Sequence, residues 1–162
     1  MTRLRARAPR GERVYGRVPR NRGQEHTTLI ASMGAGGMGP CLTVEGATTK
    51  VVFETYVEQV LAPSLSPGQM VVLDNLSAHR PKRIRELIEQ HGCELLYLPS
   101  YSPDYNPIEE AFAKIKNLLR KAAARSKETL VEAIGAALSA VTVAEVRGFF
   151  EHAGYRLTAH LL

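Results

Sequence analysis

Asp74 and Glu109 are the residues of this sequence best placed to do chemistry. Asp74 directly follows a short apolar run, residues 70–73, which predicts a strand buried on both faces. Glu109 lies in the first turn of a helix that follows the next predicted strand. Side chains at the carboxyl ends of neighbouring strands in an open α/β sheet meet in the crevice where such sheets bind ligands. Two hard oxygen ligands of this kind suit Mg²⁺ or Mn²⁺, the ions that assist phosphoryl transfer.

Each carboxylate also has a purely structural explanation. Asp74 can stabilise a turn together with Asn75 and Ser77, because short polar side chains hydrogen-bond to nearby backbone. Glu109 can complete a helix cap in which Asn106 is the N-cap residue. Carboxylates near helix N-termini are favourable in any case. Residue types and spacing alone leave both explanations open.

The helix after Glu110 is strongly basic. No acidic residue occurs before Glu128, and the cations in between are Lys114, Lys116, Arg120, Lys121, Arg125 and Lys127. Beside a metal site, a phosphate backbone is the natural ligand for this charge. The alternative is an ordinary solvated helix face.

The N-terminal segment, residues 1–25, is more basic still. It holds eight arginines and two glutamates, a net charge of +6, whereas the whole chain carries +5. Glycines and prolines interrupt it, which predicts a loop with one short strand around residues 13–18. The segment is either a contact to a DNA backbone, through arginines such as Arg3, Arg5, Arg7 and Arg13, or a disordered basic tail.

The elements that would position these residues alternate between strands and helices. Apolar and β-branched runs predict strands at 26–32, 40–44, 70–73 and 93–98, and the glycine-rich turn 34–40 joins the first two as a hairpin. Apolar residues at helical spacing predict helices at 48–61, 81–91, 106–124, 127–141 and 143–152. The helix between the last two strands predicts a parallel crossover. The order therefore predicts a mixed α/β sheet flanked by helices.

Several classes of protein are disfavoured. No apolar run approaches the roughly 20 residues of a membrane span, and the arginine-rich N-terminus is not a signal peptide. The two cysteines, Cys41 and Cys93, form no metal-binding or disulfide pattern, which favours a reduced cytosolic setting. The glycine-rich turn lacks the strand-to-helix context of a nucleotide-binding loop, so we expect no small-molecule cofactor.

Residues 74–79 (DNLSAH) and 98–109 (LPSYSPDYNPIE) resemble the catalytic core of DDE transposases, in the bacterial insertion-sequence branch of the mariner superfamily. Thirty-four residues separate Asp74 from Glu109, the spacing typical of that superfamily. The similarity extends from about residue 2 to residue 155. It includes the basic helix and the closing residues 149–155 (FFEHAGY).

The resemblance implies a ribonuclease H-like fold and two divalent metal ions, Mg²⁺ or Mn²⁺, held by three carboxylates. It implies that activated water cuts transposon-end DNA and that a 3′-hydroxyl then joins the end to target DNA. By the same match, Asp74 is the second carboxylate and Glu109 the third. Asn75, His79 and Glu110 would support the ligands or face DNA, and the alternative for His79 is to cap a helix. The implied partners are DNA and further copies of the chain, in the bacterial cytoplasm near the nucleoid.

The sequence departs from the family pattern at the first catalytic aspartate. The first catalytic aspartate should lie on the first strand, just before the segment that here begins at Met1, and no aspartate precedes Asp74. We therefore expect a basic segment at 1–25, a core at 26–155 that lacks the first strand, and a tail at 156–162. Such a chain would be a transposase fragment that is inactive alone. The alternative is a truncated, non-catalytic product that binds DNA or regulates intact transposase.

Overall fold

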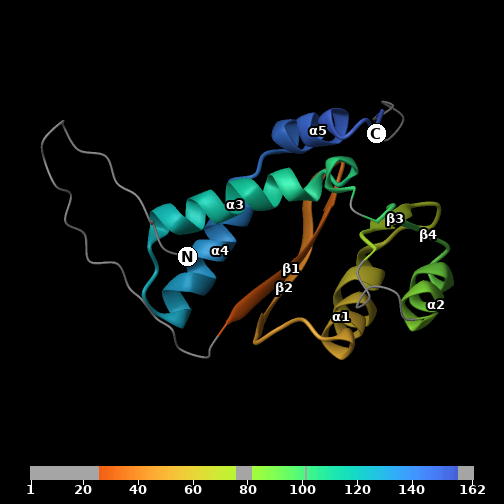
Figure 1. Ribbon diagram of the computed structural model, residues 1–162. Coiled ribbons are helices and arrows are strands. Elements are labelled where there is room, and N and C mark those ends of the chain that lie inside the picture. The colour runs from red at the N-terminus through yellow and green to blue at the C-terminus, as the bar shows by residue number, and fades with distance from the viewer. Residues whose placement is uncertain (1–25, 76–81, 101, 157–162) are drawn as a thin grey trace, which may run out of the picture.

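The computed structural model describes residues 26–75, 82–100 and 102–156 of the 162-residue chain. These residues form a mixed α/β structure in which a long β-hairpin runs between two groups of helices (Figure 1). Within the described ranges, no single helix is both long and apolar enough to cross a membrane. Only the two helices Lys127–Ser139 and Val143–His152 taken together, with a 72° bend between them, are long and apolar enough by length and composition.

The hairpin consists of β1 (Thr27–Gly34) and β2 (Gly37–Glu45), which pair antiparallel. Its position was predicted correctly, but the turn is shorter than expected, because the strands continue through most of the glycine-rich segment. Glycine allows turns without requiring them. Gly39 lies within β2, where a Cβ atom would collide with the side chain of Ser32. This glycine therefore permits close packing across the hairpin.

The first helix, α1 (Lys50–Tyr56), begins at Thr49, whose side chain accepts a hydrogen bond from the backbone of Val52. It continues as a π-helical turn, Val57–Leu61, so the predicted helix over 48–61 is confirmed. Its buried residues pack against one face of the hairpin in the first core cluster. They are Phe53, Tyr56, Val57 and Leu61.

A strand–helix–strand unit follows, made of β3 (Met70–Leu73), α2 (Lys82–Gln90) and β4 (Glu94–Tyr97). The two strands are parallel, as predicted, and Leu73 pairs with Tyr97. The predicted burial of β3 on both faces is wrong, since Met70 is 55% exposed and Leu96, on the same face of β4, is 47% exposed. Among the described residues β3 pairs only with β4, so the strands form two separate two-stranded sheets. Only one face of this narrow ribbon packs on the core.

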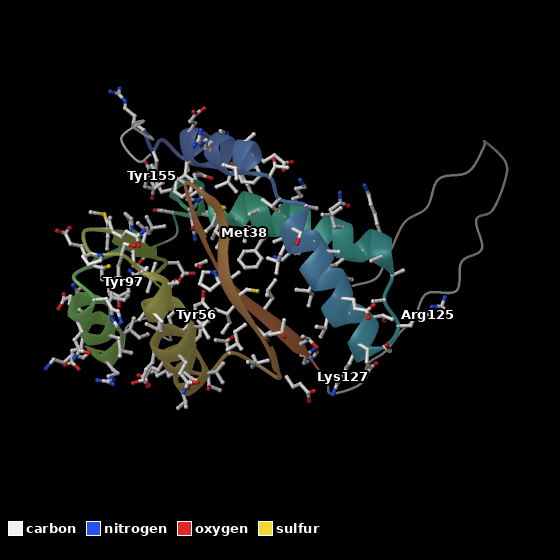
Figure 2. All side chains as sticks on the ribbon, turned by 180° about the vertical axis from the view of Figure 1, so that it is seen from behind. Met38, Tyr56, Tyr97, Arg125, Lys127 and Tyr155 are labelled. Carbon is white, nitrogen blue, oxygen red and sulfur yellow. The ribbon has the colours of Figure 1, made fainter. Side chains whose placement is uncertain are left out.

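Three helices cover the other side of the hairpin: α3 (Ile108–Ala122), α4 (Lys127–Ser139) and α5 (Val143–His152). Their second core cluster includes the buried Ile115 and Val146 and is completed by Leu29 and Met33 of β1 and Met38 of β2. Successive residues of a strand point to opposite faces, which places Leu29 in this cluster and Ile30 in the first. Figure 2 shows Met38 on the side of α3 and α4 and Tyr56 on the opposite side of the hairpin.

The start of α3 differs from the predicted cap. A 3₁₀ turn, Pro103–Tyr105, leaves Asn106 extended, and the helix begins at Ile108 with Pro107 as its N-cap residue. Pro107 has no side-chain oxygen to offer, and the backbone N–H of Glu109 donates to the carbonyl of Asn106 at 3.1 Å. The structural alternative for Glu109, completion of a helix cap at Asn106, is therefore wrong.

Candidate active site

The carboxyl ends of β3 and β4 place Asp74 and Asn75 beside the loop that leads to α3. The backbone of Leu98 donates to the carbonyl of Leu73 at 2.8 Å, and Asn75 Nδ2 donates to Ser100 Oγ at 2.8 Å. The sequence correctly predicted that Asp74 follows a parallel strand at this end. The other amide atom, Asn75 Oδ1, is buried and has no hydrogen-bond partner among the described residues. An orphaned acceptor of this kind fits a bound cation or a donor group.

A hollow of about 320 Å³ lies at the start of α3. Three separate segments line it: the 3₁₀ turn, the first turns of α3 and the end of α5. The lining residues are Pro103, Asp104, Asn106, Glu109, Glu110, Ala113, His152 and Ala153. The hollow is therefore predominantly acidic, with one imidazole opposite the carboxylates.

Glu109 is exposed within this hollow. Among the described residues its carboxylate makes no hydrogen bond or ion pair, although it is the second residue of α3. A carboxylate held on the first turn of a rigid helix, without a structural partner, is available to bind a ligand. The position is also favoured electrostatically by the helix dipole.

Glu110 is engaged. Its Oε1 lies 2.6 Å from Nδ1 of His152, at the end of α5. This hydrogen bond and the charge of Glu110, with a further contribution from Asp104, raise the pKa of His152 above its ordinary value. His152 is a member of the site that residue-by-residue sequence reasoning missed, because only the resemblance of residues 149–155 pointed to this segment.

The two predicted metal ligands have suitable chemistry but do not form a complete metal site. Asp74 is not among the residues that line the hollow around Glu109. Within the described ranges, no three His, Cys, Asp or Glu side chains converge to hold a metal ion. Hard carboxylate oxygens and the orphaned Asn75 Oδ1 fit Mg²⁺ or Mn²⁺ by type, and a full site needs at least one more protein ligand.

The basic residues of α3 divide into two groups. Lys114 is turned toward α5, where its Nζ lies 2.6 Å from Glu145 and donates to the carbonyl of Ala140 at 2.6 Å. Lys116, Arg120 and Lys121 are exposed. The sequence did not distinguish these two groups, because the ion pair of Lys114 with Glu145 depends on the position of α5.

The remaining predicted site residues lie outside the described part of the chain. They are His79 and the arginines Arg3, Arg5, Arg7 and Arg13. The expected segment 1–25 lies outside it as well, as do residues 157–162 of the expected tail 156–162.

Comparison with known proteins places these features in a family. Residues 1–131 match the family model described as DDE superfamily endonuclease. The Tcb1 transposase of Caenorhabditis briggsae is 25% identical over 118 residues, which cover 70% of this chain and 43% of that protein. The Tcb2 transposase of the same organism is 30% identical over 87 residues, covering 51% of this chain and 32% of that protein. The chain thus spans less than half the length of either relative.

Solved structures agree with the fold. The Mos1 transposase paired-end complex with the left transposon end matches with a TM-score of 0.75 at 17% identity, over 92% of this chain and 46% of that one. The Mos1 mariner paired-end complex with Mn matches with a TM-score of 0.65, also at 17% identity, over 92% of this chain and 47% of that one. The predicted ribonuclease H-like α/β fold is confirmed. On the evidence of the family model, the chain belongs to the DDE superfamily endonucleases.

Proposed function

We propose that this chain is part of a transposase that acts on transposon-end DNA by metal-dependent phosphoryl transfer. The observation that carries the proposal is that Glu109 is exposed, takes no part in a helix cap, and lines an acidic hollow at the start of a basic helix. The matched relatives are transposases, and Mos1 transposase is described in complexes with transposon ends and with Mn. The SPDYNPIE segment supports placement in the bacterial insertion-sequence branch, with a cytoplasmic, nucleoid-associated setting and self-association as parts of the proposal.

Asp74 and Glu109 are the residues that would hold the metal. A bound Mg²⁺ or Mn²⁺ would supply Lewis-acid chemistry at a phosphodiester and lower the pKa of an attacking water. Asp74 extends from the end of a strand and Glu109 from the first turn of a helix, so both are fixed to rigid elements. Asn75, which is tied to Ser100, would hold the Asp74 loop against the loop that enters α3.

The exposed side of α3 gives the DNA a path to this site. Positions i, i+4, i+7 and i+11 of an α-helix share one face, and here they are Glu109, Ala113, Lys116 and Arg120. Glu109 and Ala113 line the hollow, so the cations continue from it along the helix. A phosphate backbone following this line would meet Lys116 and Arg120 after the reacting phosphate.

The neighbouring face of α3 contacts α5 instead of being free to bind DNA. Glu110 and Lys114 are both paired with α5, to His152 and to Glu145 respectively. We therefore assign DNA contact to Lys116, Arg120 and Lys121. Lys114 serves mainly to join the two helices.

A second candidate function is a non-catalytic DNA-binding or regulatory product. The described residues offer no group of three metal ligands, which favours this reading for the chain by itself. No aspartate precedes Asp74, where the family pattern has its first carboxylate, so a first carboxylate supplied in trans or by fusion is the simplest way to complete the proposed site. Without it we expect binding to DNA but no cleavage.

The test is Mn²⁺- or Mg²⁺-dependent nicking of end-bearing DNA by the purified chain, with and without an added transposase segment that carries the missing carboxylate. We expect DNA binding in both cases and nicking only in the second. Nicking that disappears in Asp74→Asn would establish the transposase reading. Salt-dependent binding without nicking, even after addition of the segment, would support the regulatory product.

A further inference from the structure

The end of α5 forms one wall of the hollow that contains Glu109. His152 and Ala153 line it, and Ala153 is buried. Two contacts fasten this wall to segments far away in the sequence. His152 Nδ1 lies 2.6 Å from Glu110 Oε1, 42 residues apart, and Tyr155 OH donates to the carbonyl of Tyr105 at 2.8 Å, 50 residues apart.

These contacts stabilise the first turn of α3, which has no side-chain cap. The N-cap residue Pro107 makes no side-chain hydrogen bond to the first turn, and Glu109 has no partner among the described residues. Tyr155 is itself oriented by an edge-to-face contact with Phe150, with ring centroids 5.7 Å apart. The C-terminal segment 150–155 thus contacts both the loop before α3 and the residue next to Glu109.

We propose that His152 is a positioning residue, which holds the first turn of α3 through Glu110 and so fixes where the Glu109 carboxylate points. Tyr155 does the same for the preceding loop through Tyr105. This inference rests on the proposed function in one respect, namely that Glu109 binds a divalent metal ion.

The chain offers an internal comparison. Lys114 and Glu145 also join α3 to α5, with Nζ 2.6 Å from Oε2, but neither residue lines the hollow. The His152 and Glu110 side chains are 80% and 41% exposed, and exposed ion pairs contribute little to stability. The Lys114 and Glu145 side chains are less exposed, at 29% and 39%, and Glu145 also belongs to the cap of α5. A role confined to stability therefore predicts that Glu145→Gln disturbs the chain at least as much as loss of His152, whereas positioning predicts an effect on the hollow from the His152 pair alone.

The experiment uses the purified 162-residue chain with Mn²⁺ alone as the probe, and bound Mn²⁺ is measured by electron paramagnetic resonance. We expect His152→Ala to weaken Mn²⁺ binding about tenfold, the usual scale for loss of a group that orients a ligand. His152→Gln, whose amide can still donate to Glu110, should recover most of the affinity. The matched control Glu145→Gln should bind Mn²⁺ like the unaltered chain.

Amide hydrogen exchange over residues 103–113 separates this inference from the proposed function. If the unaltered chain binds no Mn²⁺, the metal-binding role of Glu109 fails for the chain alone, and exchange decides the positioning role. Faster exchange there in His152→Ala than in Glu145→Gln supports it. Equal exchange in the two variants, or equal loss of Mn²⁺ affinity, would overturn it.

Discussion

Lys114 of α3 and Glu145 of α5 form an ion pair between the two helices, with Nζ 2.6 Å from Oε2. The hydrogen bond from Lys114, together with bonds from the backbone and side chain of Thr142, lowers the pKa of Glu145 from 4.5 to about 2. Glu145 therefore combines a helix cap with a contact between helices, at the start of α5.

This pair predicts a specific acid sensitivity. Because the pKa of Glu145 is lower in the folded chain, its stabilising effect is present above pH 4.5 and is lost as the pH falls toward 2. Glu145→Gln should be less stable than the unaltered chain at pH 7, and the difference should shrink below pH 4. Thermal unfolding followed by circular dichroism across this range checks the expectation, and a difference independent of pH would contradict it.

Glu109→Gln separates catalysis from helix capping. In a transposase supplied with the first carboxylate of the family pattern, loss of Glu109 as a metal ligand should reduce cleavage by about a thousandfold or more, since metal-ion stabilisation of the transition state is worth several kcal/mol. A capping role would instead cost about 1 kcal/mol of folding stability. Because the structure shows no such cap, the midpoint of urea unfolding should fall only slightly, by the few tenths of a kcal/mol, on the order of 0.3, that an exposed carboxylate gains from the helix dipole.

Asp74→Asn should also abolish Mg²⁺-dependent cleavage in the completed enzyme while leaving affinity for transposon-end DNA within about twofold, since a carboxylate makes no favourable contact with phosphate. Gel-shift and nicking assays on the same DNA give both quantities. Glu94→Gln is the control, because Glu94 is exposed at the opposite end of the β3–β4 sheet from Asp74 and does not line the hollow. Full cleavage by Asp74→Asn would remove Asp74 from the metal site.

Replacing Lys116 and Arg120 together with glutamine should weaken DNA binding for all sequences alike. If each contacts a phosphate, the slope of log K against log salt should fall in magnitude by about 2. Lys82→Gln serves as the control, because Lys82 is exposed on α2, which lies on the other side of the hairpin (Figure 1). A double variant with an unchanged slope would refute the path along α3.

Helical elements were predictable because their apolar spacing is regular. The apolar residues at helical spacing in α2, Ile84, Leu87 and Ile88, are all buried. Burial of β3 was overestimated because an apolar run of four residues does not reveal how many strands lie beside it, and Met70 faces outward. The glycine-rich turn was drawn too long because composition does not show that Gly39 is needed for its close approach to Ser32.

The candidate site was predictable only where residues are close in sequence or carried by the family resemblance. Asp74 and the start of α3 follow from strand ends and from the SPDYNPIE segment. The His152 contact with Glu110 joins residues 42 positions apart, and no local pattern marks it. For the same reason, the basic run did not show that Lys114 turns inward while Lys116 stays exposed.

The β1–β2 hairpin has a consequence for how the described part of the chain unfolds. Leu29 and Ile30 are consecutive residues of one strand, yet each belongs to a different hydrophobic cluster. Unfolding of either cluster would expose one face of the β1–β2 hairpin to water. The two clusters should therefore unfold together, and heating should give a single cooperative transition. Movement of the hairpin would shift α1 and α3 together.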